Sequence, residues 1–525
     1  MLCCSCFLAS AQQPQPNQPI DLPEFIVTGK ERIEVPSSAK QAPSKPPSMK
    51  AQLLDSLNPT EKHPLPKLPA RSLPSPTRLY PMWPGYLEAG IGNYVTPTVA
   101  AGYSLKSGGY RFDLNGIAEA ATSAWVPNAE YLKAGADVLS TYTAPSEFVV
   151  FGGSTTEVDL GLRLRQYRLY ATAAAPKRNT TALRAGVGVK GEYEGFNYDG
   201  GASYASVSMG TDSVTGVAAK SDVTDNMLRG YLTLEQRWER YDVGARLDLR
   251  FASFAEKGYP FVEGLVFARY SNDVIRVSAG AGAQTFTSTT DISRFGLLLT
   301  GELDVFLGRA LTLQGFVRSG LRPRTFADLL EENPYVAANT VLDAAYDVFD
   351  VRGTLVLRPS LAIAATVGIR VRQSDREHIW SGDSTGTFSV LYRSVTRLQI
   401  PAEVRWLMTS RDVLSADISF TVARVDSTDQ PYVPGVSASI AYERSWTPFI
   451  RSTIAGIYIG DRFADIDNKT ALSGYVDVRL RAEMDITSAL SAHLRADNVI
   501  SNTIVLWHGY RERGAFLSGG ITWKF

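Results

Sequence analysis

The chain has 525 residues, a length that suits several domains or one large barrel. Lysine plus arginine equals aspartate plus glutamate at 53 each, so the charge gives no reason to expect a nucleic-acid partner. No run of about 18 apolar residues follows the N-terminal segment, which argues against a transmembrane helix. It does not argue against a membrane β-barrel, whose apolar face takes every second residue.

The first 11 residues, 1–11, read as the end of a secretory signal peptide. The cysteines of the chain, Cys3, Cys4 and Cys6, lie there, and the segment ends in small residues at positions 9–11. Because it has no basic start and a short apolar stretch, we expect the initiation codon to lie upstream of Met1. A lipoprotein signal fits less well, since small residues do not precede a cysteine. Cleavage after position 11 leaves no cysteine for disulfides or thiolate metal sites.

Residues 12–83 form a proline-rich arm that we expect to be disordered. Of the 28 prolines, 16 fall within residues 1–84, and such a composition cannot bury enough apolar surface to offset the entropy of ordering. Within the arm, residues 23–30 read PEFIVTGK. An isolated strand in such a tail can add to the exposed sheet edge of another protein, and a chance cluster is the alternative. The docking residues of this hypothesis are Glu24, Phe25, Ile26, Val27 and Thr28.

From residue 84 to 525, apolar and polar residues alternate as they do in β-strands. Residues 476–486, VDVRLRAEMDI, and residues 242–251, DVGARLDLRF, show the pattern most clearly. A soluble antiparallel sandwich has the same alternation in a single strand. The strands recur at about a dozen residues each, however, which fits the roughly 9–11 tilted residues that cross a bilayer. The charged faces are expected to line a lumen, and the candidates are Asp477, Arg479, Arg481, Glu483, Asp485, Arg246, Asp248 and Arg250.

Short turns alternate with longer connections, as in outer-membrane barrels. The short turns lie near residues 240, 272, 308, 359, 411, 447 and 488. The longer connections span 254–261, 286–293, 320–345, 374–384, 425–433, 460–471 and 501–513. About seven strands lie between Gly85 and Met209 and about 15 from Asn226 onward, with 385–409 as one long strand bent at Pro401. The sequence therefore predicts an all-β fold, a closed antiparallel transmembrane β-barrel of about 22 strands (20–24).

The last strand, residues 517–525, reads LSGGITWKF and ends in an aromatic residue. Its outward set resembles the signal read by the machinery that inserts outer-membrane barrels, and consists of Leu517, Gly519, Ile521, Trp523 and Phe525. An ordinary edge strand is the alternative, although a free aromatic edge is an aggregation risk in a soluble protein. Aromatic residues near strand ends are predicted to anchor the barrel at the membrane interfaces. They are Trp83, Tyr86, Trp406, Trp446, Trp507 and Trp523.

Four stretches together resemble one family, the TonB-dependent receptors of Gram-negative outer membranes. PEFIVTG at 23–29 resembles the TonB box, and SGLRPRTFADLLEENPYV at 319–336 resembles the segment in which a turn leads into a short helix and an Asn-Pro pair. Residues 459–502 and 508–525 are similar to the penultimate and closing strands of the family. The resemblance implies an outer-membrane location, an arm in the periplasm and the TonB periplasmic domain as a partner.

The resemblance covers the barrel and the box but not the globular plug that the family places between them. Residues 31–84 show no strand-and-helix pattern typical of a plug. A barrel of this width leaks unless something fills its lumen. The candidates are residues 31–84, long loops folded inward, and a separate plug or lipoprotein subunit.

No residue pattern indicates an enzyme, a resident metal or a cofactor. The four histidines lack metal-ligand spacing, and neither a nucleophile elbow nor a phosphate-binding loop occurs. His508 is interpreted as an incidental loop residue rather than a ligand contact. One acidic loop is interpreted as solvated rather than calcium-binding, because the glycine and terminal glutamate of a calcium-binding hand loop are missing. Its residues are Asp461, Asp465, Asp467 and Asn468.

Three functions stay open on the sequence. The first is a TonB-energised transport barrel for a bulky nutrient or chelate, with outer-membrane lipid, the TonB periplasmic domain and the barrel-insertion machinery as partners. The second is a passive, porin-like channel. The third is a structural barrel that scaffolds another envelope protein. The sequence does not reveal a substrate.

Overall fold

The computed structural model describes residues 83–123, 125–147, 152–213 and 221–525. The predicted signal peptide, the arm up to residue 82 and the docking strand Glu24–Thr28 lie outside the described residues. Within them, 22 strands form a closed antiparallel β-barrel with one short helix, α2 (Phe326–Glu332). In this part of the chain no helix has the length and apolarity needed to cross a membrane.

The first half of the ring consists of β1 (Gly85–Gly92), β2 (Thr96–Ser107), β3 (Tyr110–Ala121), β4 (Tyr131–Thr143), β5 (Thr155–Arg168), β6 (Lys177–Tyr193), β7 (Phe196–Thr211), β8 (Ser221–Trp238), β9 (Tyr241–Phe254), β11 (Phe261–Ser271) and β12 (Ile275–Thr287). The second half consists of β13 (Ser293–Phe306), β14 (Leu311–Pro323), β15 (Ala344–Ser360), β16 (Ile363–Gly382), β17 (Phe388–Leu407), β18 (Asp412–Val425), β20 (Val436–Ser445), β21 (Ile450–Ile459), β24 (Tyr475–Asp485), β25 (Leu490–Asp497) and β28 (Phe516–Lys524). The connections contain the short strands β10 (Lys257–Gly258), β19 (Thr428–Asp429), β22 (Arg462–Phe463), β23 (Ala471–Leu472), β26 (Val505–Trp507) and β27 (Tyr510–Arg511).

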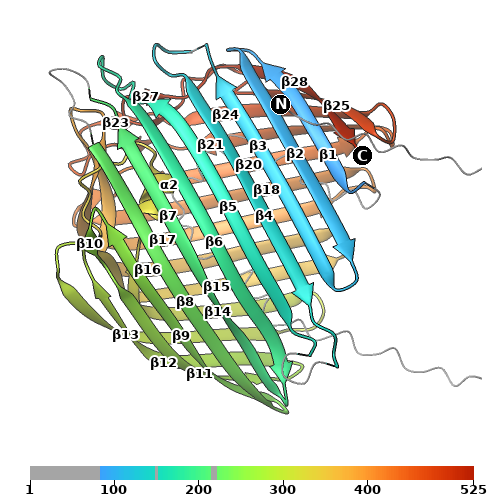
Figure 1. Cartoon of the computed structure of the whole chain (residues 1–525), viewed down its shortest axis with the longest axis vertical. Coiled ribbons are helices and arrows are strands. Elements are labelled where there is room, and N and C mark those ends of the chain that lie inside the picture. The colour runs from blue at the N-terminus through green and yellow to red at the C-terminus, as the bar shows by residue number, and fades with distance from the viewer. Residues whose placement is uncertain (1–82, 124, 148–151, 214–220) are drawn as a thin grey trace, which may run out of the picture. The chain divides into compact units, whose positions relative to one another are not determined.

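Each ring strand pairs with the next, and β28 pairs with β1, so the sheet closes on itself (Figure 1). Tyr86 lies opposite Lys524, and Gly92 lies opposite Ser518. Closure satisfies the backbone groups that an open edge would expose to lipid. The predicted fold class and the count of 22 strands are confirmed, with seven strands before β8 and 15 from β8 onward. The last strand is therefore a closing strand between β25 and β1.

Alternation along each strand separates an apolar outer face from a polar inner face. On β5, Leu160 and Leu162 are 46% and 39% exposed, whereas Asp159 between its apolar neighbours forms an ion pair with Arg184 of β6 at 2.8 Å. Exposed leucines and valines follow the same pattern around the whole ring. So large an exposed apolar surface is what a barrel wall presents to lipid.

The two ends of the barrel differ. At one end, here called the turn end, connections such as 194–195 and 239–240 are short, and Gly85 and Phe525 exchange backbone hydrogen bonds of 2.9 and 3.0 Å. At the other end, here called the loop end, the connections are long, as at 324–343, 460–474 and 498–515. The predicted alternation of short turns and long connections matches this arrangement.

Some local predictions are wrong. The stretch 374–384 belongs mostly to β16, which continues to Gly382, because its polar residues have buried partners at the loop end. β8 begins at Ser221, before the predicted Asn226. Trp507 does not lie in an interface belt, since it is 5% exposed and packs among the loops. For Trp507 the packing partner Tyr432 is distant in sequence, whereas the first residues of β8 pair with β7, the strand just before it.

Candidate functional site

The connection between β14 and β15, residues 324–343, folds into the loop end and is called the mouth loop below. A register shift interrupts β14 just before it, at Gly320. Gly320 has a φ of 140°, a backbone conformation that residues with a Cβ rarely adopt. The N–H of Leu321 then donates to the side chain of Gln284 on β12 at 2.6 Å. This bulge places both Leu321 and Arg322 in buried positions and directs the chain into the mouth.

Helix α2 opens the mouth loop and is fixed to one wall of the barrel. Its first turn is a capping box, in which the side chains and backbone N–H groups of Thr325 and Asp328 bond reciprocally. Phe326 is fully buried and stacks on Phe254 of β9, with ring centroids 4.5 Å apart. Asp225 of β8 accepts a hydrogen bond from the helix backbone at 3.2 Å. These contacts hold the helix against the β8–β9 wall.

The last residue of α2, Glu332, is held by strand β16 and by Arg324 of the mouth loop. Its carboxylate contacts His378 Nε2 at 2.9 Å and the indole N–H of Trp380, both on β16, and Arg324 Nη1 at 2.8 Å. Burial by itself raises the pKa of Glu332, but the charges of His378 and Arg324 and the hydrogen bonds from β16 outweigh it. The pKa is held at about 2. Glu332 is therefore an anion that ties the helix to β16.

Residues 335–337 of the mouth loop bridge the barrel. Arg178 of β6 donates to the carbonyl of Val336 at 2.8 Å. On the other side, Phe388 of β17 donates its N–H to the carbonyl of Tyr335 at 3.0 Å and accepts from Ala337 at 2.9 Å. β6 and β17 are the sixth and sixteenth of the 22 ring strands, so they lie on nearly opposite walls. The chain thus crosses the mouth of the barrel at this point.

Aromatic side chains fill the space around this crossing. Tyr335 stacks on Tyr510, with ring centroids 3.4 Å apart and planes at 11°. Trp507 contacts Phe388 at 5.3 Å and Tyr432 at 4.6 Å between ring centroids. The main buried apolar cluster of the described residues lies here and combines the mouth loop with strand ends and the other long connections. Packed side chains of the chain itself therefore occupy the space around the crossing at the loop end.

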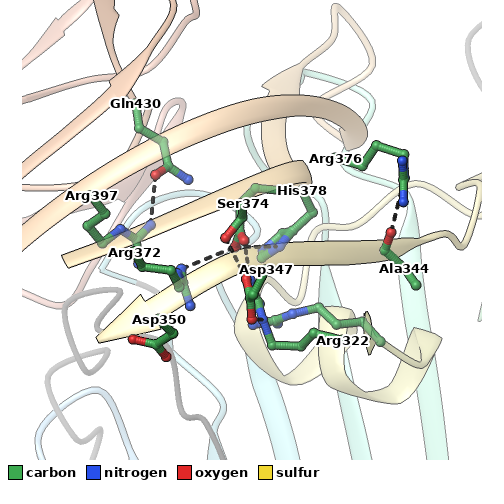
Figure 2. A network of polar contacts seen from close by, with 12 residues as sticks. Arg322, Ala344, Asp347, Asp350, Arg372, Ser374, Arg376, His378, Arg397 and Gln430 are labelled. Carbon is green, nitrogen blue, oxygen red and sulfur yellow. Dashed lines mark hydrogen bonds and ion pairs between the residues drawn. The ribbon is translucent and has the colours of Figure 1, made fainter. Parts of the chain in front are cut away.

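A polar network lies next to the mouth loop on strands β14 to β17 (Figure 2). Arg322 binds Asp347 at 2.9 Å and also contacts the carboxylate of Glu377. Arg372 lies 3.6 Å from Glu377. These four residues are at most 7% exposed. Glu377 is adjacent to His378, so the network is continuous with the contacts of Glu332.

The eight charged residues proposed to line the lumen lie on β9 and β24. Most of them form ion pairs: Arg479 with Asp477 at 2.7 Å, Arg481 with Glu483 at 2.7 Å, Asp485 with Lys524 at 3.2 Å, and Asp248 with both Arg229 at 2.7 Å and Arg250 at 3.0 Å. Arg246 is exposed. On β24 they alternate with the exposed Val476, Leu480 and Met484. Contact with a passing solute stays a prediction for all eight.

The loop end carries a cavity of about 380 Å³. Its lining includes Phe388, Tyr432, His508 and Asp383. Burial alone raises the pKa of Asp383, but hydrogen bonds from Thr385 and Thr387 outweigh it and lower the pKa. His508, interpreted from the sequence as an incidental loop residue, thus lines a cavity at the loop end.

The acidic loop at 461–468 uses its polar groups to fold. Asp465 accepts from the backbone N–H groups of Lys469 at 3.0 Å and Thr470 at 2.6 Å, and Asn468 bonds with the backbone of Asp429. Asp461 accepts from the N–H of Gly474 at 2.5 Å. Among the described residues, no three His, Cys, Asp or Glu side chains lie close enough to hold a metal ion.

No protein-family model and no curated protein matches the chain. Solved structures do match it. The FrpB iron transporter from Neisseria meningitidis, in its apoprotein form, is 11% identical with a TM-score of 0.67, covering 84% of this chain and 81% of that chain. The copper transporter OprC is 12% identical with a TM-score of 0.65, covering 84% and 80%. The ferric-catecholate import receptor Fiu from E. coli K12, in its closed form, is 9% identical with a TM-score of 0.63, covering 84% and 82%.

The barrel has the TonB-dependent receptor fold. Identities this low establish the receptor fold alone. Part of the sequence motif at 319–336 is also visible, because the expected short helix is α2 and the Asn-Pro pair follows it. The side chain of Asn333 accepts from the N–H of Tyr335 at 2.9 Å and thereby shapes the crossing.

Sequence reasoning missed the residues that cross the mouth of this receptor-fold barrel. Glu332 and Tyr335 lie within the quoted motif, and the Thr325–Asp328 spacing is a signal that identifies the helix start. Nothing in the sequence pairs Arg178 with Val336, which is 158 residues away.

Proposed function

We propose that the protein is an outer-membrane transport barrel whose outer mouth is closed by its own mouth loop, and that it takes up a bulky nutrient or chelate. The observation that carries the proposal is the bridge from β6 through residues 335–337 to β17. A ring of about 22 strands encloses a lumen wide enough to leak, so a transporter of this size needs a closure. Loops folded inward were one of the three candidates for this role.

Orientation follows from the two ends of the barrel. In outer-membrane barrels the short turns face the periplasm and the long loops face outside. The turn end, where Gly85 and Phe525 meet, is therefore proposed to face the periplasm. The arm that precedes Gly85 then starts in the compartment where the TonB periplasmic domain is found.

The substrate class is proposed by analogy with the solved structures. Those proteins are described as an iron transporter, a copper transporter and a ferric-catecholate import receptor. A metal chelate is therefore a reasonable first substrate to test for this chain. The closed mouth speaks against a steadily open porin. A structural barrel that scaffolds another envelope protein has no specific observation in its favour.

Single-channel conductance in planar bilayers tests the closure. The full-length protein is expected to show little steady current, and replacing residues 326–342 by a glycine-serine linker is expected to produce large, steady channels. Glu331→Gln, a change at an exposed position of α2 with no wall contact described, serves as the control and is expected to behave as the full-length protein. Large steady currents from the full-length protein would identify a porin and overturn the proposal.

Binding to the TonB periplasmic domain tests the docking strand. Deleting residues 23–30 is expected to abolish binding of the purified full chain to that domain, because Phe25, Ile26 and Val27 would supply the strand that adds to its sheet. Deleting residues 40–47, elsewhere in the arm, is the length-matched control and is expected to leave binding intact. Equal binding by both deletion variants would remove the docking hypothesis.

A further inference from the structure

Three neighbouring turns at the turn end each combine an exposed apolar side chain with an exposed arginine. They are the β13–β14 turn at 307–310, the β15–β16 turn with the end of β15 at 358–362, and the β17–β18 turn at 408–411, together called the arginine turns below. Their apolar residues Leu307, Leu361 and Met408 are 54%, 102% and 44% exposed. Their arginines, in the same order, are Arg309, Arg358 and Arg411.

Backbone hydrogen bonds join the arginine turns side by side. The N–H of Arg358 donates to the carbonyl of Ala310 in the preceding turn at 2.7 Å. The N–H of Leu407, just before the third turn, donates to the carbonyl of Ala362 at 2.7 Å. The three turns therefore form one continuous stretch of the barrel rim.

Little negative charge lies beside these arginines. The arginine turns contain no aspartate or glutamate. Within the described part of the chain, the side chains of Arg309 and Arg358 form no hydrogen bond or ion pair. Arg411 is adjacent to Asp412, whose carboxylate already forms an ion pair with Arg444 at 3.3 Å. The positive charge of this stretch of rim is therefore available to a partner.

Other short turns of the same rim have a different charge. The turns at 194–195, 239–240 and 272–274 carry the exposed acidic residues Glu194, Glu239 and Asp273, and the arginine in the second of them, Arg240, is adjacent to Glu239. On the other side of the arginine turns, the turns at 446–449 and 486–489 contain no charged residue. Among these turns, the excess of positive charge belongs to the sector from β13 to β18.

An apolar side chain beside an available arginine suits the surface of a phospholipid bilayer. The strands that lead into the arginine turns expose Leu303, Leu313 and Trp406 on the outer, apolar face, so the turns lie where the acyl region ends. At this depth an apolar side chain buries against acyl chains while a guanidinium group reaches the phosphates. A soluble acidic ligand would leave the apolar residues unexplained, and an uncharged lipid surface would leave the arginines unexplained.

We propose that the arginine turns form a binding surface for anionic phospholipid in the leaflet at the turn end, with the headgroup phosphates on the three arginines and the acyl chains on the three apolar residues. In the orientation proposed above, this leaflet is the inner leaflet of the outer membrane. The same headgroups repel the acidic turns at 194–195, 239–240 and 272–274, so anionic lipid holds one side of the rim closer to the bilayer than the other. The surface anchors the barrel and is independent of the solute that the barrel transports.

Native mass spectrometry of the full-length protein in detergent tests the surface, with dioleoylphosphatidylglycerol as the anionic probe and dioleoylphosphatidylcholine as the zwitterionic probe at constant ionic strength. The wild type is expected to bind the first phosphatidylglycerol about tenfold more tightly than phosphatidylcholine. Arg358→Gln, in the central turn, is expected to reduce this preference about fivefold, which corresponds to about 1 kcal/mol for one basic residue near an anionic surface. Leu361→Ser is expected to weaken binding of both lipids about threefold or more, because the leucine no longer buries against acyl chains.

Arg240→Gln is the matched control, since it removes an exposed turn arginine beside Glu239, and it is expected to change the preference by less than about twofold. Heat-dependent mobility in gel electrophoresis verifies that each variant is folded.

A wild type with no preference for phosphatidylglycerol would overturn the lipid surface and leave the exposed apolar tips to a protein partner. Equal loss in Arg358→Gln and Arg240→Gln would also overturn it, as would displacement of the bound lipid by an excess of inorganic phosphate, because the site would then recognise free phosphate. Conductance in planar bilayers is a separate measurement. Large steady currents together with intact lipid preference would overturn the proposed function alone.

Discussion

The loop end and the turn end of the barrel are made by the same strands but are held together differently. At the loop end, Phe326 and Tyr335 are 0% and 4% exposed and pack against side chains from distant strands. At the turn end, Leu361 and Phe449 are 102% and 62% exposed, and the chain is held by hydrogen-bonded turns and neighbouring strand pairs. The loop end therefore depends on burial across the lumen, whereas the turn end depends on local pairing.

This difference separates closure from the integrity of the ring. Strand pairing and the β1–β28 seam maintain the barrel, and they involve no residue of the mouth loop. Changes in the mouth loop are thus expected to open the loop end while leaving the ring intact. Equivalent changes at the turn end are expected neither to open the loop end nor to disrupt the ring.

The largest effect is expected for Phe326→Ala. Truncating a fully buried phenylalanine costs about 3–5 kcal/mol through lost burial and the cavity left behind. Hydrogen exchange at the N–H of Leu329, which donates to Thr325 at 3.2 Å, measures the free energy of opening α2. That free energy is expected to fall by this amount.

Phe449→Ala is the matched change at the turn end and is expected to leave the exchange of α2 unaltered, since the Phe449 ring is exposed. If the two substitutions have equal effects on α2, burial at the loop end does not hold the helix, and the contrast between the two ends is lost.

A smaller effect is expected for Arg178→Gln. Arg178 is 1% exposed and donates to the carbonyls of Pro334 at 3.1 Å and Val336 at 2.8 Å, and the buried carbonyls lose those partners. We expect a loss of about 3 kcal/mol in the stability of the crossing, measured by hydrogen exchange at the N–H of Ala337. Arg163→Gln is the control, because its ion pair with Asp137 is exposed and worth about 1 kcal/mol or less. If the N–H of Ala337 is protected from exchange equally well in Arg178→Gln, the contacts with β17 alone hold residues 335–337 in place.

Acid is expected to loosen the mouth loop through Glu332. Its folded-state pKa of about 2 lies below the ordinary value of 4.5, so the carboxylate stabilises the closed loop above about pH 4.5. That contribution, about 2–3 kcal/mol, is lost as the pH falls from 4.5 toward 2. Channel open probability in planar bilayers is expected to rise over this window, and Glu332→Gln is expected to remove most of the rise.

The neighbouring Glu331→Gln controls for the general effect of acid, because Glu331 is exposed. It is expected to keep the wild-type pH dependence. If the wild type, Glu332→Gln and Glu331→Gln all show the same pH dependence, other carboxylates cause the acid effect and Glu332 does not.

The ring of strands could be predicted from the sequence, but the crossing of the mouth loop could not. The reason is physical. The alternation of apolar and polar residues over 476–485 and over the other strands is a local signal. It identified the 22 strands because the outer face of each strand must meet lipid. The polar network beside the mouth loop depends on register, which shifts at bulges between Asp347 and Phe349 and between Ser374 and Glu377. The crossing at Val336 depends on a partner on β6 that no local pattern specifies.

The smallest effect is expected at the bulge that directs the chain into the mouth. Gly320→Ala places a Cβ in a backbone conformation with a φ of 140° and 2.5 Å from Oε1 of Gln284, the group that accepts from Leu321. A strained backbone position of this kind costs about 1–3 kcal/mol. Gly230→Ala on β8 is the control, because an added Cβ there meets no atom within 4 Å. Hydrogen exchange at the N–H of Leu321 is expected to quicken in Gly320→Ala only. Equal exchange in both variants would mean that the mouth loop holds its position without the bulge, so that its contacts with β6, β8 and β17 suffice to close the barrel.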